Sequence, residues 1–119
     1  MTENTEGVKE VKGFMPRAVR YAQRVDDDFA AGISELYKAI WSERENGLPM
    51  KEKHLISFSI ACSKNNAESA TKILERLKKF GATRQEIEDA MMIATWTSGV
   101  QYFTDFSIVI LEEMDRLGF

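Results

Sequence analysis

The sequence predicts an all-α fold of five or six helices around an antiparallel helical hairpin. Apolar residues recur every three or four positions through most of the chain, which is the period of an amphipathic helix. No segment alternates polar and apolar residues over a useful length, as a half-buried strand would. Capping residues and helix-ending glycines or prolines separate the periodic segments, so the boundaries of the helices can be predicted as well.

The first 13 residues lack this period. Residues 1–13 are polar and include two glycines, so we expect a flexible N-terminal arm. Residues 14–119 should form a single domain, because a chain of 119 residues is too short for two hydrophobic cores.

Two helices are expected next. Pro16 suits a first helical turn, where its missing amide costs nothing, and opens a short helix to about Ala22. The run 26–28 of three aspartates then begins a longer helix, because the helix dipole favours acidic groups there. We expect that helix to end at Asn46-Gly47, with Pro49 beyond it. Its apolar stripe consists of Phe29, Ile33, Leu36, Tyr37, Ile40 and Trp41.

The central hairpin follows. The helix from Lys51 to about Ser63 is apolar nearly all round, so it should be the most buried. A short turn leads to the capping pattern Asn65-x-x-Glu68 and a second helix that ends at Gly81. Because the connection is short, the two helices should pack as an antiparallel pair.

A capping box, Thr83-x-x-Glu86, begins the next helix. A break at Ser98-Gly99 should separate it from the last one. The apolar residues of the last helix that share one face are Phe103, Phe106, Ile110, Leu111, Met114 and Leu117.

Composition excludes several classes of function. Sixteen basic and nineteen acidic residues give a net charge of −3, which argues against a nucleic-acid surface. No apolar run is long enough for a membrane span and no signal peptide is evident, so we expect a soluble, cytoplasmic protein. With one cysteine and one histidine, the chain has no internal disulfide and no histidine-rich metal site. We expect neither a metal nor a cofactor.

Two side chains are candidates for chemistry. His54 is either a satisfied, half-buried histidine or a proton-transfer group, since it should lie at the depth of Ile73 across the hairpin. Ser69 would then lie one turn nearer the loop. Cys62, near the end of an apolar helix, should be a packed and inert sulfur, because burial and the helix dipole both oppose ionisation.

Four segments recur together at a characteristic spacing: Leu48-Pro49, Lys53-His54-Leu55-Ile56, Gly81-Ala82-Thr83-Arg84-Gln85-Glu86-Ile87, and a helix that ends near Gly99. With these segments the chain resembles the carboxymuconolactone decarboxylase and alkylhydroperoxidase D-like family, over about residues 14–118. The resemblance implies an all-α protein that assembles into homo-oligomers, often trimers or hexamers.

The family's functional residues transfer poorly. The Cys-x-x-Cys-x-x-x-His motif of the peroxidase branch would place its cysteines at Asn66 and Ser69 and its histidine at Ile73, so all three are replaced. Peroxide reduction of that kind needs an attacking and a resolving thiol, so we do not expect it here. An acidic proton-relay position falls on His54, which can still exchange a proton near neutral pH. In the decarboxylase branch the histidine also falls on Ile73, while an acid persists at Glu68.

Three functions remain open. The first is a cofactor-free enzyme that acts on a small organic acid or lactone, in which His54 donates a proton and Ser69 or Asn66 binds a substrate oxygen. Its substrate pocket would be lined by Cys62, Asn66, Glu68, Ile73 and Trp96. The second is an inactive oligomeric binding or scaffold protein, with aromatic residues that serve as subunit contacts or simply as core: Trp96, Tyr102, Phe103 and Phe106. The third is a peroxidase that uses Cys62 alone with an external resolving thiol.

Overall fold

The computed structural model describes residues 7–9, 12 and 16–119 of the chain. The described part is entirely helical apart from its loops, so the predicted all-α fold is confirmed. Residues 7–9 and 12 are helical in addition to helices α2 to α7, which makes one helical segment more than the largest number predicted. The chain divides into two compact units, residues 1–47 and 48–119, and the expected single domain therefore stays a prediction.

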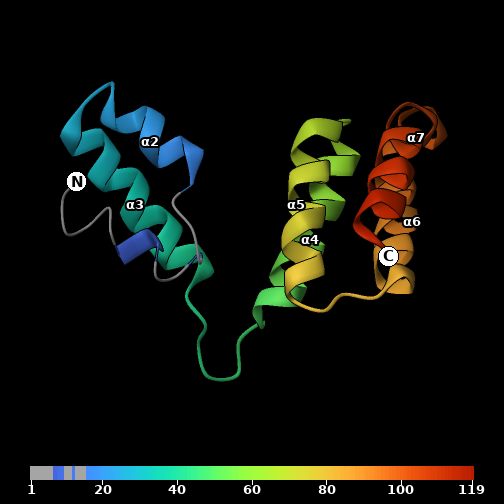
Figure 1. Cartoon of the computed structure of the whole chain (residues 1–119), viewed down its shortest axis with the longest axis horizontal. Coiled ribbons are helices and arrows are strands. Elements are labelled where there is room, and N and C mark those ends of the chain that lie inside the picture. Colours follow the sequence, from blue (N-terminus) through green and yellow to red (C-terminus); the bar gives the residue numbers. More distant parts are fainter. Residues whose placement is uncertain (1–6, 10–11, 13–15) are drawn as a thin grey trace. The chain divides into compact units, whose positions relative to one another are not determined.

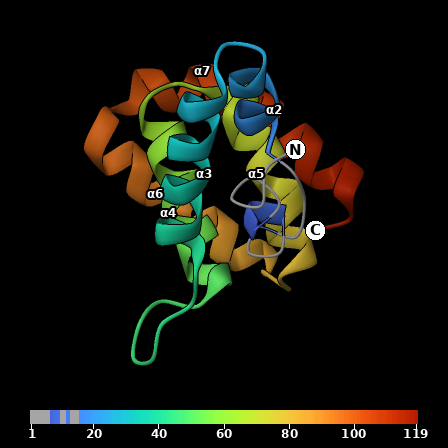
Figure 2. The same ribbon diagram turned by 90° about the vertical axis from the view of Figure 1, so that its left-hand side faces the viewer.

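In the first unit, α2 (Arg17–Gln23) and α3 (Asp27–Trp41) lie side by side as a helical hairpin (Figure 1, Figure 2). Pro16 is the N-cap of α2 rather than a residue of its first turn. Asp26 is the N-cap of α3, and its carboxylate accepts a hydrogen bond of 2.8 Å from the backbone amide of Phe29. The acidic run therefore caps a helix, as the sequence predicts.

The end of α3 differs from the prediction. The helix ends at Trp41, before the expected Asn46, because Ser42 turns into the extended region. The Ser42 hydroxyl donates to the Lys38 carbonyl (2.5 Å), and the Arg44 guanidinium donates to the Ala39 carbonyl (2.5 Å). The Lys38 carbonyl keeps its helical partner, the Ser42 amide at 3.1 Å, so Arg44 is the side chain that replaces a backbone donor, at the Ala39 carbonyl.

The packing of the first unit also differs from the sequence pattern. Ala30 and Ser34 are the buried residues of α3, while much of its predicted apolar stripe is exposed. Within the predicted arm, Val8 is fully buried and the Lys12 ammonium lies 3.5 Å from the centre of the Trp41 ring. The other residues of the arm, 1–6, 10–11 and 13, lie outside the described part, so its flexibility stays a prediction.

The second unit is a four-helix bundle of α4 (Met50–Ser63), α5 (Ala67–Lys79), α6 (Arg84–Ser98) and α7 (Val100–Leu117). Successive helices run in opposite directions, so α4 and α6 are parallel to each other (Figure 1). Helix α4 packs on both α5 and α6, and α7 packs on the same two helices from the other side. The largest core side chains are Phe58, Leu74, Leu77, Ile87, Phe106, Ile110 and Met114.

Most helix ends in this unit follow the predicted signals. Thr83 and Glu86 form the full capping box of α6, and Gly81 and Gly99 adopt φ angles of 78° and 98° at the two breaks. The cap of α5 is shifted by one residue: Asn66 accepts from the Ser69 amide, while Asn65 adopts a left-handed φ of 55° in the turn. Asparagine tolerates both positions, so the sequence alone does not distinguish them.

Candidate functional site

His54 lies in the contact between α4 and α5. Its side chain is 2% exposed, and its ring centre lies 5.0 Å from that of Phe80 at the end of α5. Its Nδ1 atom lies 2.7 Å from the Met50 carbonyl oxygen. Since a carbonyl only accepts hydrogen bonds, Nδ1 carries a proton and donates it to Met50. The ring is therefore both packed and hydrogen-bonded within its own unit.

Cys62 is fully buried in the core of the bundle. Burial raises the pKa of its thiol from 9.0 to about 12. The thiol is consequently protonated at neutral pH, which is the inert state expected of a packed cysteine.

The remaining predicted residues of the hairpin serve mainly the start of α5. The Asn66 side chain accepts from the Ser69 amide at 3.1 Å, and the exposed Glu68 forms an ion pair of 3.0 Å with Lys72. Ile73 is partly buried against the core. The structure thus places six of the seven predicted site residues on the α4–α5 hairpin or its turn.

Trp96, the seventh, belongs to α6 and is 90% exposed. Of the other aromatic candidates, Tyr102 is exposed, while Phe103 and Phe106 pack edge to face with ring centres 5.7 Å apart. Phe106 is fully buried, so its interpretation as a subunit contact is wrong and its interpretation as core is correct.

An open groove lies on a different side of α4, between α4 and α6. It has a volume of about 510 Å³, and none of its lining residues belongs to the predicted site. Ile56, two positions after His54, lies about 200° around the helix from it, so the groove and the histidine occupy opposite faces of α4. The residues that line the groove are Leu55, Ile56, Ser59, Ile60, Ser63, Glu86, Asp89, Ala90, Ile93, Ala94 and Thr97.

The apolar character of α4 on nearly all sides is a sequence signal for this groove. That pattern predicts the most buried helix, yet Ile56 and Ile60 are 48% and 49% exposed. Helix α4 packs on both α5 and α6, but these neighbours leave the face that carries Ile56 and Ile60 open beside α6.

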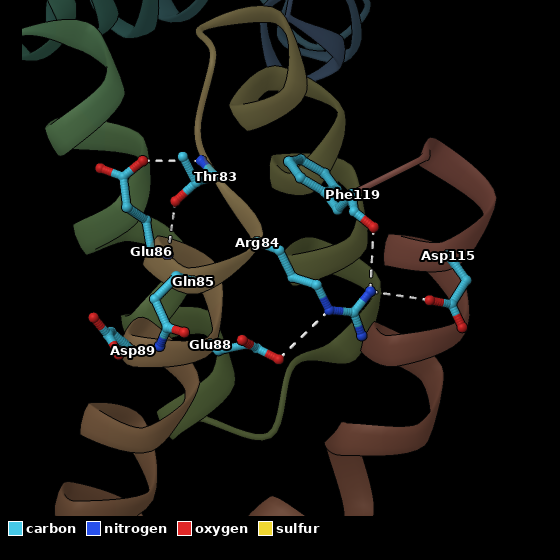
Figure 3. A network of polar contacts seen from close by, with 8 residues as sticks. All are labelled: Thr83, Arg84, Gln85, Glu86, Glu88, Asp89, Asp115 and Phe119. Carbon is cyan, nitrogen blue, oxygen red and sulfur yellow. Dashed lines mark hydrogen bonds and ion pairs between the residues drawn. The ribbon is translucent and has the colours of Figure 1, made fainter.

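The groove is acidic at one end. The Lys51 ammonium lies 2.9 Å from Glu86, and the Ser59 hydroxyl donates to the Ala90 carbonyl at 3.0 Å, so the start of α4 lies beside the start of α6. The Glu86 carboxylate also accepts from the Thr83 amide at 2.9 Å (Figure 3). The Thr83 backbone first, and then Lys51, lower the pKa of Glu86, while Glu86 raises the pKa of Lys51.

Arg84 fixes the start of α6 against the end of the chain (Figure 3). Its guanidinium lies 3.1 Å from the Asp115 carboxylate and 3.5 Å from Glu88, and it donates to the Phe119 carbonyl at 3.2 Å. The hydrogen bond to Asp115 is the first cause of a raised Arg84 pKa. These contacts join α6 to α7, so the acidic end of the groove has a fixed position in the bundle.

The chemistry of the groove is limited. Its lining combines aliphatic side chains with hydroxyls and the carboxylates of Glu86 and Asp89. Lys51 neutralises much of the Glu86 charge, but Asp89 adds a carboxylate that repels an organic acid, so this surface suits an apolar or partly cationic occupant. Among the described residues, no group of three histidine, cysteine or acidic side chains could hold a metal ion. Within residues 7–9, 12 and 16–119, no helix combines the length and the apolar composition of a transmembrane span.

The helical bundle, its capping box and its buried hairpin define a class of small all-α proteins. The family model described as the carboxymuconolactone decarboxylase family matches residues 27–109. That match covers more than half of the chain, and the chain therefore belongs to the carboxymuconolactone decarboxylase family. Comparison with curated proteins and with solved structures found no match.

Proposed function

We propose that this chain is a self-associating binding or scaffold member of its family, without decarboxylase or peroxidase activity. The observation that carries the proposal is the separation of His54 from the open groove. The histidine is packed and bonded between α4 and α5, while the groove opens on the opposite face of α4. The group with the best chemistry and the surface with the best access therefore lie apart.

A decarboxylase would need His54 to reach its substrate. With 2% of its side chain exposed and Nδ1 bonded to Met50, the ring serves the packing of α4 against α5. The oxygen of the Asn66 side chain is likewise used to cap α5. Both roles stabilise the hairpin, and both favour the binding or scaffold function over the enzyme.

A peroxidase that uses Cys62 alone would need its thiolate. The pKa of about 12 leaves very little thiolate at neutral pH, and the sulfur is fully buried. The third function is therefore the least supported.

Exposed apolar side chains support self-association. Ile93 and Trp96 on α6 are 63% and 90% exposed, and Val100 follows at the start of α7. Apolar side chains gathered on an exposed surface are typical of interfaces, and tryptophan is enriched among the few residues that dominate binding energy there. The trimer or hexamer that the family resemblance implies is the expected form of this assembly.

The test combines a mass with an activity. Sedimentation velocity should show a species larger than the monomer, and carboxymuconolactone decarboxylation and thiol-dependent peroxide consumption should not exceed the buffer rate. Turnover that disappears in His54→Gln would overturn the proposal in favour of the enzyme. Peroxide consumption that disappears in Cys62→Ser would favour the peroxidase, and a monomer at every concentration would overturn self-association.

A further inference from the structure

Three residues of α4 and its C-cap residue, Lys64, form one row along the outside of the bundle. Glu52, Ile56, Ile60 and Lys64 follow each other at intervals of four residues, and such positions form a continuous ridge on a helix. The two isoleucines are about half exposed, Glu52 is partly exposed and Lys64 is exposed. We call this row the α4 ridge; it has an acid at one end, a base at the other and two isoleucines between them.

The α4 ridge is complementary to itself in the reverse direction. When two copies of the ridge lie antiparallel with their centres at position 58, residue 52 of one faces residue 64 of the other. Residues 56 and 60 face each other in the same way. Each acid then meets a base and each isoleucine meets an isoleucine, at both ends of the contact. A parallel arrangement would instead place like charges together.

From this pattern we infer that the α4 ridge is an interface between two copies of this chain, related by a two-fold axis. The inference rests on the proposed self-association and names its surface and geometry. It selects a hexamer built of two-fold pairs over a trimer, because a three-fold ring has no two-fold axis. In this pair, Glu52 lies opposite Lys64 of the partner subunit, and Ile56 lies opposite Ile60 of the partner subunit. A two-fold axis requires one surface to match itself, and the sequence of charges along the ridge meets that requirement. The antiparallel order also brings the start of each α4 near the end of the other, which the helix dipoles favour.

The groove beside the ridge accommodates the ridge of the partner subunit. Ile56 and Ile60 form one wall of the groove, and Ile93 lies on the opposite wall. The ridge of the partner subunit enters this groove and covers its apolar lining, in the way that ridges of packed helices fill grooves. Trp96, beside the α6 wall and 90% exposed, is covered by the same contact.

The charges provide the sharper test. Glu52→Lys and Lys64→Glu each place two like charges opposite each other at both ends of the pair. Each should therefore weaken association about tenfold at low salt, since two attractive surface pairs become repulsive. The double variant Glu52→Lys/Lys64→Glu restores opposite charges and should return to within about threefold of the unchanged protein. Sedimentation velocity on the full chain, over a range of concentrations, measures the strength of association of the unchanged protein, the two single variants and the double variant.

The apolar contact has a matched control. Ile60→Ser should abolish the pair at micromolar concentration, while Ile108→Ser, at an exposed isoleucine of α7, should leave it unchanged. Circular dichroism melts of both variants establish that the bundle is still folded.

The outcomes separate this inference from the proposed function. If the protein associates but the double charge variant is no better than the single ones, or Ile60→Ser behaves as Ile108→Ser, the α4 ridge is not the interface and self-association still stands. A monomer at every concentration would overturn both. An apolar fluorescent probe that binds the unchanged monomer but does not bind Ile60→Ser would assign the groove to a small ligand instead.

Discussion

Lys51 and Glu86 join the starts of two parallel helices. The ammonium of Lys51 on α4 lies 2.9 Å from the carboxylate of Glu86 on α6, and that carboxylate also completes the capping box with Thr83. The Glu86 side chain thus caps α6, joins α6 to α4 and also lines the groove. The start of α6 is consequently a place where local and long-range interactions depend on each other.

The capping box gives the first prediction. Thr83→Ala removes the oxygen that accepts from the Glu86 amide at 3.1 Å, and should lower the free energy of unfolding by about 1 kcal/mol. Urea denaturation followed by circular dichroism measures the change. Thr104→Ala on α7 is the control. The Thr104 hydroxyl only donates to the Val100 carbonyl of its own helix, and alanine is the better helix former. A loss at Thr104 equal to that at Thr83 would contradict the role of the cap.

Glu86 gives a prediction of pH dependence. Its pKa is lowered in the folded protein, first by the Thr83 backbone and then by Lys51, from an ordinary value of 4.5. The unfolded state therefore takes up this proton first, so the stabilisation is complete above pH 4.5 and is lost as the pH falls through the folded pKa. The urea midpoint of the unchanged protein should approach that of Glu86→Gln as the pH falls from neutral to acid.

Lys51→Gln is the control for this pH dependence. Because the Thr83 backbone is the larger cause of the lowered pKa, removing Lys51 should reduce the pH-dependent difference without abolishing it. A difference that disappears completely in Lys51→Gln would show that the ion pair, and not the cap, stabilises the carboxylate.

The helix starts could be predicted from the sequence because their signals are local. Asp26 and Thr83 bond amides three residues ahead, so a single pattern contains both partners. The end of α3 could not be predicted in this way. Arg44 bonds the Ala39 carbonyl in place of a backbone amide, and the Ser42 hydroxyl bonds the Lys38 carbonyl in addition to its own amide. Neither residue is among the usual stop signals, while Asn46 takes a positive φ of 63° in the turn beyond.

The candidate site was harder to predict than the fold. The sequence predicts His54 beside α5 at the depth of Ile73, but the ring lies against Phe80 at the end of that helix. The sequence also does not show that the ring is packed there and bonded to the Met50 carbonyl. It also could not distinguish a covered apolar face from an open one. Ile56 and Ile60 have the pattern of core residues, and only the positions of the neighbouring helices show that they remain exposed.

His54 gives a prediction that separates packing from chemistry. His54→Ala removes a buried ring from its contact with Phe80 and leaves the Met50 carbonyl without this donor. The free energy of unfolding should fall by about 2–4 kcal/mol, as for other large buried side chains replaced by alanine. Urea denaturation measures the loss. A variant of unchanged stability that has lost a measurable turnover would contradict the packing role and restore the catalytic one.

Cys62 gives the last prediction, on the alkaline side. Its folded pKa of about 12 exceeds the ordinary value of 9.0, so the unfolded chain loses this proton first as the pH rises. The stabilisation is therefore complete below pH 9.0 and declines above it, toward the folded pKa. Relative to Cys62→Ala, the unchanged protein should lose about 1 kcal/mol of unfolding free energy between about pH 8.5 and 10. All other titratable groups are the same in both proteins, so the comparison isolates the thiol. A difference that stays constant over this range would mean that the sulfur ionises as easily in the folded protein as in the unfolded chain. That result, together with rapid alkylation of the native protein, would return Cys62 to the set of reactive residues.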